Sequence, residues 1–536
     1  MKGRFAGLVL ALAWLGWNLP VPGGAGHADE QGRTGRVPGE APGADAAIRT
    51  HPVLAAADSR TKARGGRAAI WEIQGAGHVS PHLGARVRTS GIVTAATANG
   101  FYLQDPAGDG DDRTSDGIFV DTRKKPGVAA GDAVSVSGKV GEYVPGGART
   151  DNLSVTQIGG SPSVTVISSR NPLPHPVVVG ASGRRPPAEI IDDDRFTRFD
   201  PESDGIDFHE SLESMRVTVA AALALAPTTR FGEIYVVADL GAGASGINPR
   251  GGLTLSPGDF NPERLQIDDS LMPGSMPEVD TGDRLGDVTG VVGYRFGNFE
   301  VLPAASPTPV SGSLEPESAT LRGDAGHLLV ASFNLLNLDP NDGDGEADVA
   351  DGRFAALAGQ IVGSLNSPDI LALQEVQDDS GSDDDGTTAA GRTLRTLTEV
   401  IAGAGGPAYS AIDNPPADGK DGGQPGGNIR VAFLYNAERV ELAGRPLRLE
   451  DADGEDAFED ARKPLQAAFE FDGERIVLIN NHFTSRGGSS PLFGRLQPPA
   501  IGGLEKREAQ AAFLKAHVDG LLAADPEARI LLLGDF

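Results

Sequence analysis

The chain has 536 residues, 39% of them hydrophobic, and this size and composition predict three or four domains with ordinary cores and exclude a disordered protein. The absence of cysteine excludes disulfides, catalytic thiols and thiolate metal sites. The net charge of -28 excludes a general attraction to polyanions, so a nucleic-acid partner would need a local basic patch.

Residues 1–28 contain the segments of a secretory signal peptide in the usual sequence: basic, then apolar, then small residues. Two basic residues precede an apolar stretch, and small residues up to Ala28 offer a cleavage point. The alternative is a membrane anchor, but about 13 apolar residues are too few to span a bilayer. We therefore expect a secreted, extracellular protein without a membrane span. Residues 29–67 lack hydrophobic periodicity and predict a flexible leader.

Residues 68–165 and 206–305 predict two β-rich modules of related design. In both, short apolar stretches alternate with Gly and Asp turns, and a Pro-rich linker at 166–205 separates them. "GFYLQD" in the first is echoed by "GEIYVVAD" in the second, and "GDAVSVSGKVGEY" by "GDRLGDVTGVVGY". We interpret the two as divergent copies of one five-stranded, OB-like barrel, which could bind single strands or serve as a scaffold.

After a second linker at 306–327, residues 328–536 alternate strands with helices, as in a layered α/β domain. Four of its strands end in a polar residue: Asn334, Glu375, His482 and Asp535. If the strand ends meet on one side of the sheets, an amide, two carboxyl groups and an imidazole converge on one cleft. Any one of these residues alone is more often a solvated cap or a core residue.

The motifs around these residues carry a family resemblance. "SFNLLNL", "LALQEV", "NNHFTS" and "LLLGDF" resemble the successive motifs of the endonuclease/exonuclease/phosphatase superfamily, whose fold is that of deoxyribonuclease I. The chain is most similar to large secreted bacterial extracellular endonucleases that carry β modules ahead of this domain. The resemblance covers roughly residues 70–536. It implies two OB-like modules followed by an α/β four-layer sandwich that is incomplete at its C-terminus.

The resemblance also gives an expectation for the chain end. In the family, the last strand present here ends in Gly-Asp-x-Asn, and a later Ser-Asp-His segment follows. This chain stops after "LLLGDF", one residue before the expected asparagine. We therefore expect a fragment that is weakly active or inactive alone, with a natural terminus as the alternative.

Site roles follow from the same resemblance. It implies that Glu375 is the principal ligand of Mg²⁺ or Mn²⁺ and that Asn334 supports the metal or the phosphate. His482 would contact the scissile phosphate, and Asp535 would orient or activate the attacking water. Two arginines in "GGNIRVAF" and "DARKPL", Arg430 and Arg462, could contact phosphate, although surface or structural roles are equally open.

A Ca²⁺ site is a further option in the loop from Asp339 to Asp348, which has carboxylates at alternate positions. The loop lacks the full twelve-residue spacing with a terminal glutamate, so the pattern favours a solvated loop. A modest basic patch lies in residues 482–510, where four basic residues oppose two acidic ones, although an ordinary mixed surface is an equal alternative.

The leading hypothesis is a secreted, metal-dependent phosphodiesterase, a nonspecific endonuclease acting on extracellular DNA, with RNA as a further substrate. The same fold also serves phospholipid phosphodiesterases and phosphatases, so the same residues could cut another phosphate ester. A third alternative is a noncatalytic surface-binding protein built on the β modules. Nucleic acid is the expected partner, and no stable protein partner is expected.

Overall fold

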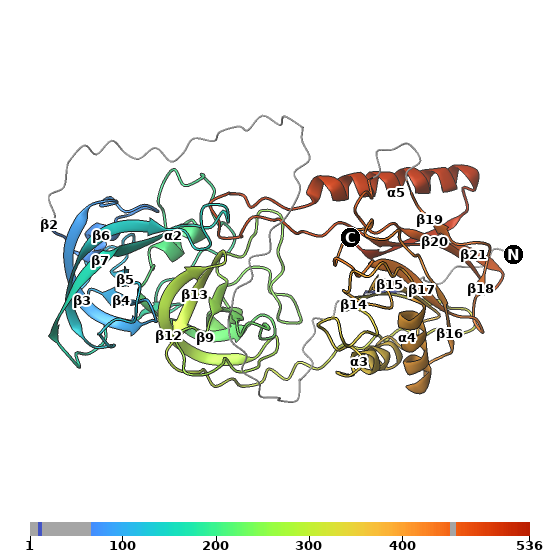
Figure 1. Ribbon diagram of the computed structural model, residues 1–536, viewed down its shortest axis with the longest axis horizontal. Helices are drawn as coiled ribbons and strands as arrows, with labels where there is room; N and C mark the ends of the chain where they lie inside the picture. The colour runs from blue at the N-terminus through green and yellow to red at the C-terminus, as the bar shows by residue number, and fades with distance from the viewer. Residues whose placement is uncertain (1–8, 13–65, 451–456) are drawn as a thin grey trace.

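The computed structural model describes residues 9–12, 66–450 and 457–536. Two β modules and a layered C-terminal unit follow one another along the chain (Figure 1). Most of the predicted signal peptide and leader lies outside the described residues. Their described parts are β1 (Val9–Leu12), which pairs with a strand of the C-terminal unit, and β2 (Gly66–Arg67), which pairs with the first module.

The first module is a closed ring of five strands preceded by α1 (Ile70–Gln74). The ring runs β3-β4-β5-β7-β6 and closes where β6 pairs with β3; only β5 and β7 are parallel. Alternating Val, Ile and Leu side chains of these strands fill its interior. The strands are β3 (Arg86–Ala96), β4 (Gly100–Gln104), β5 (Gly117–Asp121), β6 (Ala133–Tyr143) and β7 (Val155–Ser168).

The second module repeats this strand order. Its ring runs β9-β10-β11-β13-β12 and closes between β12 and β9, again with one parallel pair, β11 and β13. Its strands are β9 (Arg216–Ala224), β10 (Ile234–Val237), β11 (Leu265–Ile267), β12 (Arg284–Arg295) and β13 (Asn298–Pro303). Three short elements accompany them: β8 (Val177–Val179), α2 (Gly205–Glu210) and η1 (Asp239–Gly241).

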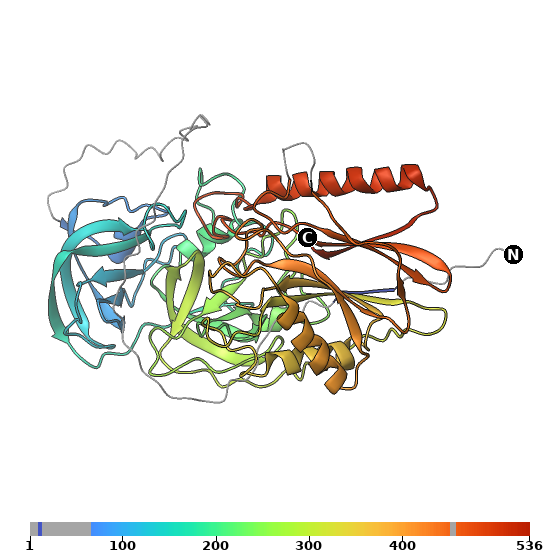
Figure 2. The same cartoon turned by 45° about the vertical axis from the view of Figure 1, so that its right-hand side comes forward.

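The C-terminal unit contains two facing sheets with helices outside them (Figure 2). One sheet has the order β1-β14-β15-β17-β16, and the other has the order β18-β20-β21-β22 with β19 also on β20. The strands of the first are β14 (Leu329–Leu338), β15 (Ile370–Val376), β16 (Tyr409–Ile412) and β17 (Arg430–Asn436). Those of the second are β18 (Glu441–Leu442), β19 (Leu447–Arg448), β20 (Leu465–Phe471), β21 (Glu474–His482) and β22 (Arg529–Asp535).

Helices cover the outer face of each sheet, which confirms the predicted four-layer arrangement. The helices α3 (Arg353–Gly359), η2 (Gln360–Ser364) and α4 (Gly391–Gly403) pack on the first sheet, and α5 (Leu504–Ala524) packs on the second. Apolar residues of both sheets form a core between them, because each strand alternates its side chains between two buried faces. No helix within the described ranges is long and apolar enough to cross a membrane.

Residues 485–503, which we call the strap, join the C-terminal unit to both modules. The strap leaves β21 just after His482, reaches towards the modules and returns to α5 (Figure 1). Phe493 is 1% exposed and belongs to the core of the second module. Arg495 forms a 2.6 Å ion pair with Asp151 of the first module. The loop after β21 is therefore anchored outside its own domain.

Candidate active site

The four strand ends meet, two from each sheet. Asn334 lies inside β14, which continues to Leu338 and so does not end at Asn334 as the sequence predicts; its regular pairing with the parallel neighbour β15 breaks off here, where Asn334 is opposite Gln374. Glu375 lies next to the end of β15. His482 and Asp535 are opposite each other on the parallel neighbours β21 and β22. Since parallel strands end on the same side of a sheet, the facing sheets bring all four side chains to one edge of the sandwich.

Short distances connect these four residues. The Asn334 amide nitrogen donates to Glu375 Oε1 at 2.9 Å and to Asp535 Oδ2 at 3.0 Å. His482 Nε2 lies 3.7 Å from Glu375 Oε1. One potential ligand atom each from Glu375, His482 and Asp535 lies within 4.8 Å of the others. The arrangement can hold a divalent cation, with the amide keeping the two carboxylates apart.

Local backbone geometry directs two of these side chains. Glu375 has a φ of +56°, a left-handed conformation at an irregularity in the pairing of β15. Such a conformation in a non-glycine residue costs about 1–3 kcal/mol and often marks a functional site. Before Asp535, a Cβ on Gly534 would lie 2.0 Å from the Asn481 carbonyl oxygen, so only glycine allows β21 and β22 to approach this closely.

His482 is held neutral at the floor of the site. Burial, together with the charge of the nearby Arg462, lowers its pKa to about 3. Its Nδ1 is buried and has no hydrogen-bond partner among the described residues. A neutral imidazole with a free ring nitrogen can bind a metal or hydrogen-bond to a phosphoryl oxygen.

The two predicted arginines have different positions. Arg462 is 7% exposed and donates to the Phe483 carbonyl oxygen, and its buried Nε has no partner within the described part of the chain. Burial lowers the pKa of Arg462, while the charges of Glu375 and Asp535 oppose that shift. Arg462 therefore lies close enough to the site to interact with an anion bound there.

Arg430, by contrast, has a structural position. Its side chain has no solvent exposure. It donates to the carbonyl oxygens of Asn428 and Thr388 and lies 3.5 Å from Asp413. The structure gives this guanidinium no free donor face for a phosphate, so the structural alternative replaces the phosphate-binding role.

Supporting polar residues beside the site were missed by the sequence analysis. Gln374 and Asn480, both buried, join the two sheets by a 2.7 Å hydrogen bond. Asn481 donates to the carbonyl oxygens of Ile479 and Leu533. The sequence does contain an indication of these residues: polar amides stand inside the apolar strands "LALQEV" and "LINNHF". A buried amide needs a hydrogen-bond partner, so such positions predict contacts between strands.

The loop from Asp339 to Asp348 is exposed over its middle part and buried at its two end carboxylates. Asp339 and Asp348 are 1% and 5% exposed. Asp348 accepts a hydrogen bond from the Asp339 amide and pairs with Arg353 at 2.7 Å, and Arg353 also donates to the carbonyl oxygen of Leu335. These two carboxylates support the fold at the end of β14, whereas Asp342 and Glu346 between them are exposed, as expected for a solvated loop. The Ca²⁺ option there stays a prediction.

The donor set at the strand ends fits a hard divalent cation. The two carboxylates supply oxygen atoms, which Mg²⁺ and Mn²⁺ prefer, and Mn²⁺ also accepts an imidazole. The orphaned Nδ1 of His482 is the kind of buried polar atom that a ligand would satisfy.

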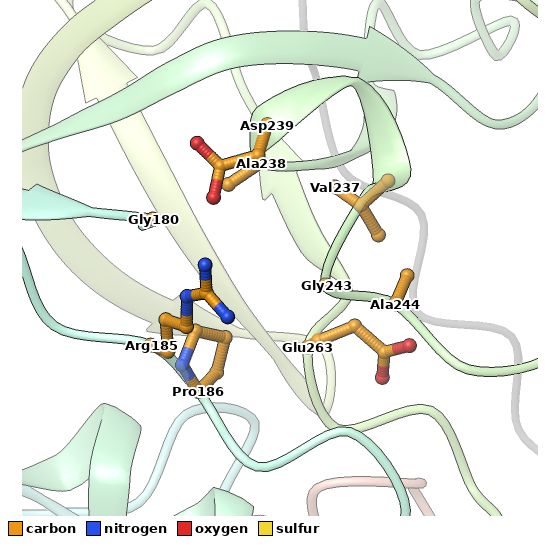
Figure 3. A pocket seen from close by; sticks show the side chains of 9 residues that line it. All are labelled: Gly180, Arg185, Pro186, Val237, Ala238, Asp239, Gly243, Ala244 and Glu263. Carbon is orange, nitrogen blue, oxygen red and sulfur yellow. The ribbon is translucent and has the colours of Figure 1, made fainter. Parts of the chain in front are cut away.

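A pocket in the second module is a poor alternative site. Figure 3 shows the Arg185 guanidinium pointing into it, with the carboxylates of Asp239 and Glu263 to either side. Its volume is about 20 Å³, enough for roughly one water molecule. Asp239 is also engaged by the Ala181 amide. The pocket is too small for a phosphate ester.

The chain was compared with curated proteins and with solved structures. No curated protein matched the chain. The similar solved structures include TDP2 of D. rerio complexed with a single-strand DNA product (17% identity), truncated TDP2 of Caenorhabditis elegans (20%) and an endonuclease/exonuclease/phosphatase family protein of Bacteroides thetaiotaomicron (17%). Each match covers 39% of this chain and 60% to 62% of the solved chain, with TM-scores of 0.24 to 0.25.

Two family models match parts of the chain. Residues 178–312, which contain the second module, match a domain of unknown function (DUF8508). Residues 424–536 match the Endonuclease/Exonuclease/phosphatase family, and this stretch includes His482 and Asp535. The C-terminal part of the chain therefore carries an endonuclease/exonuclease/phosphatase domain.

Proposed function

We propose that the protein is a secreted, metal-dependent phosphodiesterase that cleaves nucleic acid, with DNA as its main substrate and RNA as a further one. The observation that carries the proposal is the convergence of Glu375, His482 and Asp535 within 4.8 Å, bridged by Asn334. Export is supported by the leader sequence alone.

The residues suggest a division of labour. Glu375 and Asp535 would hold Mg²⁺ or Mn²⁺, which supplies positive charge against the phosphoryl oxygens. Neutral His482 is placed to hydrogen-bond to a phosphoryl oxygen, and Arg462 adds a fixed positive charge beside it. The carboxylate of Asp535 is suited to orient the attacking water and accept its proton. Asn334 donates a hydrogen bond to each carboxylate and so fixes their separation.

A basic face on the first module supports nucleic acid as the substrate class. Arg86 of β3 lies opposite Lys139 of β6, and Arg67 of β2 lies opposite Arg88 of β3. Like charges facing each other across strands destabilise a sheet. In a chain of net charge -28, such a face is suited to a phosphate backbone.

We further propose that both modules are OB-like barrels. The closed order of five strands, with one parallel pair in each ring, supports this assignment. The basic face lies on the outer side of the first ring, where it could guide a substrate strand.

The test is hydrolysis of supercoiled plasmid in Mg²⁺ or Mn²⁺, run beside RNA, a phosphomonoester and phospholipid vesicles. Chelation should abolish plasmid cleavage, and Glu375→Gln should lower its rate by at least about 100-fold, because one charged ligand is lost with little change of shape. Glu346→Gln, in an exposed loop of the same domain, is the control. Mn²⁺ binding by calorimetry gives a readout that does not depend on turnover. Cleavage of vesicles or the monoester alone would favour the alternative substrates.

A further inference from the structure

A second group of carboxylates lies between β8 and α2, far along the chain from the strand-end site. Ligand oxygens of Asp192, Asp194 and Asp204 lie within 4.8 Å of one another, and so do those of Asp200, Asp204 and Asp207. Asp204 belongs to both sets. Four carboxylates are therefore gathered around the buried Asp204 in a stretch of 16 residues.

Asp204 has a buried oxygen without a partner. The residue is 2% exposed, and its Oδ1 has no hydrogen bond among the described residues. It directly precedes α2, where an aspartate commonly accepts a backbone N–H of the first turn, yet it makes no such bond. The side chain instead faces the other carboxylates. An unpaired buried carboxylate is costly, so the position needs a positive partner.

Asp200 presents a similar feature. Its Oδ1 is also buried and without a partner within the described part of the chain. The remaining member of this set, Asp207, accepts from the Asp200 amide at 2.7 Å and contacts His78 Nε2 at 2.7 Å. These bonds hold the three carboxylates together while two of their oxygens stay unsatisfied.

Among the described residues, the arginine that contacts this group lies at its exposed edge. Arg198 lies 3.2 Å from Asp194 and 3.4 Å from Asp200, but its side chain is 71% exposed. Within the described part of the chain, an arginine therefore neutralises the exposed edge of the group but not its buried centre at Asp204.

We propose that Asp200, Asp204 and Asp207 form a Ca²⁺ site, with Asp192 and Asp194, which group with the same Asp204, completing its acidic surroundings. Ca²⁺ takes oxygen ligands at about 2.3–2.6 Å, so two ligands on opposite sides of the ion lie up to about 5 Å apart. The three aspartates of the set offer oxygen ligands only, whereas the strand-end set includes an imidazole. Mg²⁺ requires a tighter octahedron and keeps more of its water.

The bound ion would order the junction of the two modules. His78 belongs to the segment before β3 of the first module, and it reaches Asp207 of α2. The His78 ring also packs edge-on against Phe196 and Phe199 of the acidic segment, at 4.9 and 5.3 Å between ring centres. Calcium at this point would join the first module to the second.

The experiment counts bound Ca²⁺ after chelation and dialysis against a Ca²⁺ buffer, and follows thermal unfolding with and without the ion. All variants carry Glu375→Gln, so that the strand-end site contributes little. Asp204→Asn should lose one bound Ca²⁺ per chain and the Ca²⁺-dependent rise in Tm. Asp193→Asn is the matched control, because it removes one charge from the same segment but belongs to neither set.

Asp200→Asn provides a second variant should Asp204→Asn fail to fold, and it should show the same loss. The proposal is overturned if the parent chain binds no Ca²⁺, or if the parent, Asp200→Asn and Asp193→Asn bind the same number of ions. A response to Mg²⁺ equal to that to Ca²⁺ would also contradict it. Loss of plasmid cleavage plays no part in this readout, so the proposal and the proposed function can fail separately.

Discussion

Gln374 Nε2 donates a 2.7 Å hydrogen bond to Asn480 Oδ1, from one sheet of the C-terminal unit to the other. Asn480 in turn donates to the carbonyl oxygens of Leu373 and Ala432. Gln374 directly precedes Glu375 on β15, and Asn480 lies two residues before His482 on β21. This bond therefore fixes the separation of the sheets where the site needs it.

Replacing Asn480 by leucine should destabilise the C-terminal unit by about 3–5 kcal/mol, since it removes three buried hydrogen bonds. Denaturant unfolding would measure the loss. In the double variant Gln374→Leu/Asn480→Leu, the cost should be less than the sum of the single costs, because one orphaned partner is removed. Additive costs would show that the two side chains are not coupled.

Because the strap contributes Phe493 to the core of the second module, the stability of that module should depend on the C-terminal unit. Phe493 packs against Phe299 and His209, with ring centres 5.6 Å away in both cases. Phe493→Ala should therefore cost about 3–5 kcal/mol. The control is Leu496→Ala, because Leu496 is 40% exposed in the same strap. Equal unfolding midpoints for Phe493→Ala and the control would contradict the packing role.

The Tyr294 hydroxyl joins the strap to both modules. It accepts from the Leu153 amide at 3.0 Å and donates to the Phe493 carbonyl oxygen at 2.5 Å. Tyr294→Phe should cost about 1–3 kcal/mol, because the Leu153 amide and the Phe493 carbonyl lose a buried partner. A change near zero would mean that water replaces the hydroxyl.

The contact between the modules should weaken as pH rises. Glu213 accepts from Gln74 Nε2 at 2.9 Å and from the Thr156 amide at 3.1 Å, and burial raises its pKa from 4.5 to about 8. The folded state then binds the proton more tightly than the unfolded chain. This contribution to stability is full below pH 4.5 and is lost as pH rises towards 8.

Glu213→Gln tests this pH dependence, because glutamine resembles the protonated acid. Its free energy of unfolding should fall less between pH 5 and about 8 than that of the parent chain, as measured by urea titrations. Glu278→Gln, at an exposed position of the second module, should follow the parent. If Glu213→Gln also follows the parent, Glu213 is ionised in the folded state.

Much of the C-terminal fold could be predicted from its strand pattern. Phe354, Leu357, Ile361 and Leu365, spaced as on one helical face, are all buried. The strand ends were also predicted to converge, because parallel strands finish on one edge of a sheet. Burial of Arg430 could not be seen from the sequence, since its partners are backbone carbonyls of loops that fold back onto β17.

Two other features left no periodic signal. The strap is rich in Gly, Pro and Ser, and Phe493 contacts residues about 200 positions earlier, which no local pattern reports. The acidic group around Asp204 fell within the predicted Pro-rich linker, where charged residues usually indicate a solvated surface. Only the fold shows that Asp204 is buried there.

Asn334 provides the sharpest test of the strand-end site. Its amide donates to both Glu375 and Asp535, so the side chain separates two carboxylates that would otherwise repel each other. In Asn334→Asp, an acceptor replaces this donor and a third negative charge joins the group. With chelator present at neutral pH, the variant should lose about 1–3 kcal/mol of stability, and part of that loss should return with Mn²⁺.

Plasmid cleavage by Asn334→Asp should fall by about 100-fold or more, because the carboxylates are no longer held at their separation and the added charge opposes an anionic substrate. Asn436→Asp is the control, since the Asn436 oxygen only accepts a hydrogen bond, from the Glu438 amide, and an aspartate can do the same. If Asn334→Asp cleaves as fast as the control and is equally stable in chelator, the bridging amide has no role in the site. A loss of activity without the Mn²⁺-dependent recovery of stability would instead place Asn334 at the phosphate.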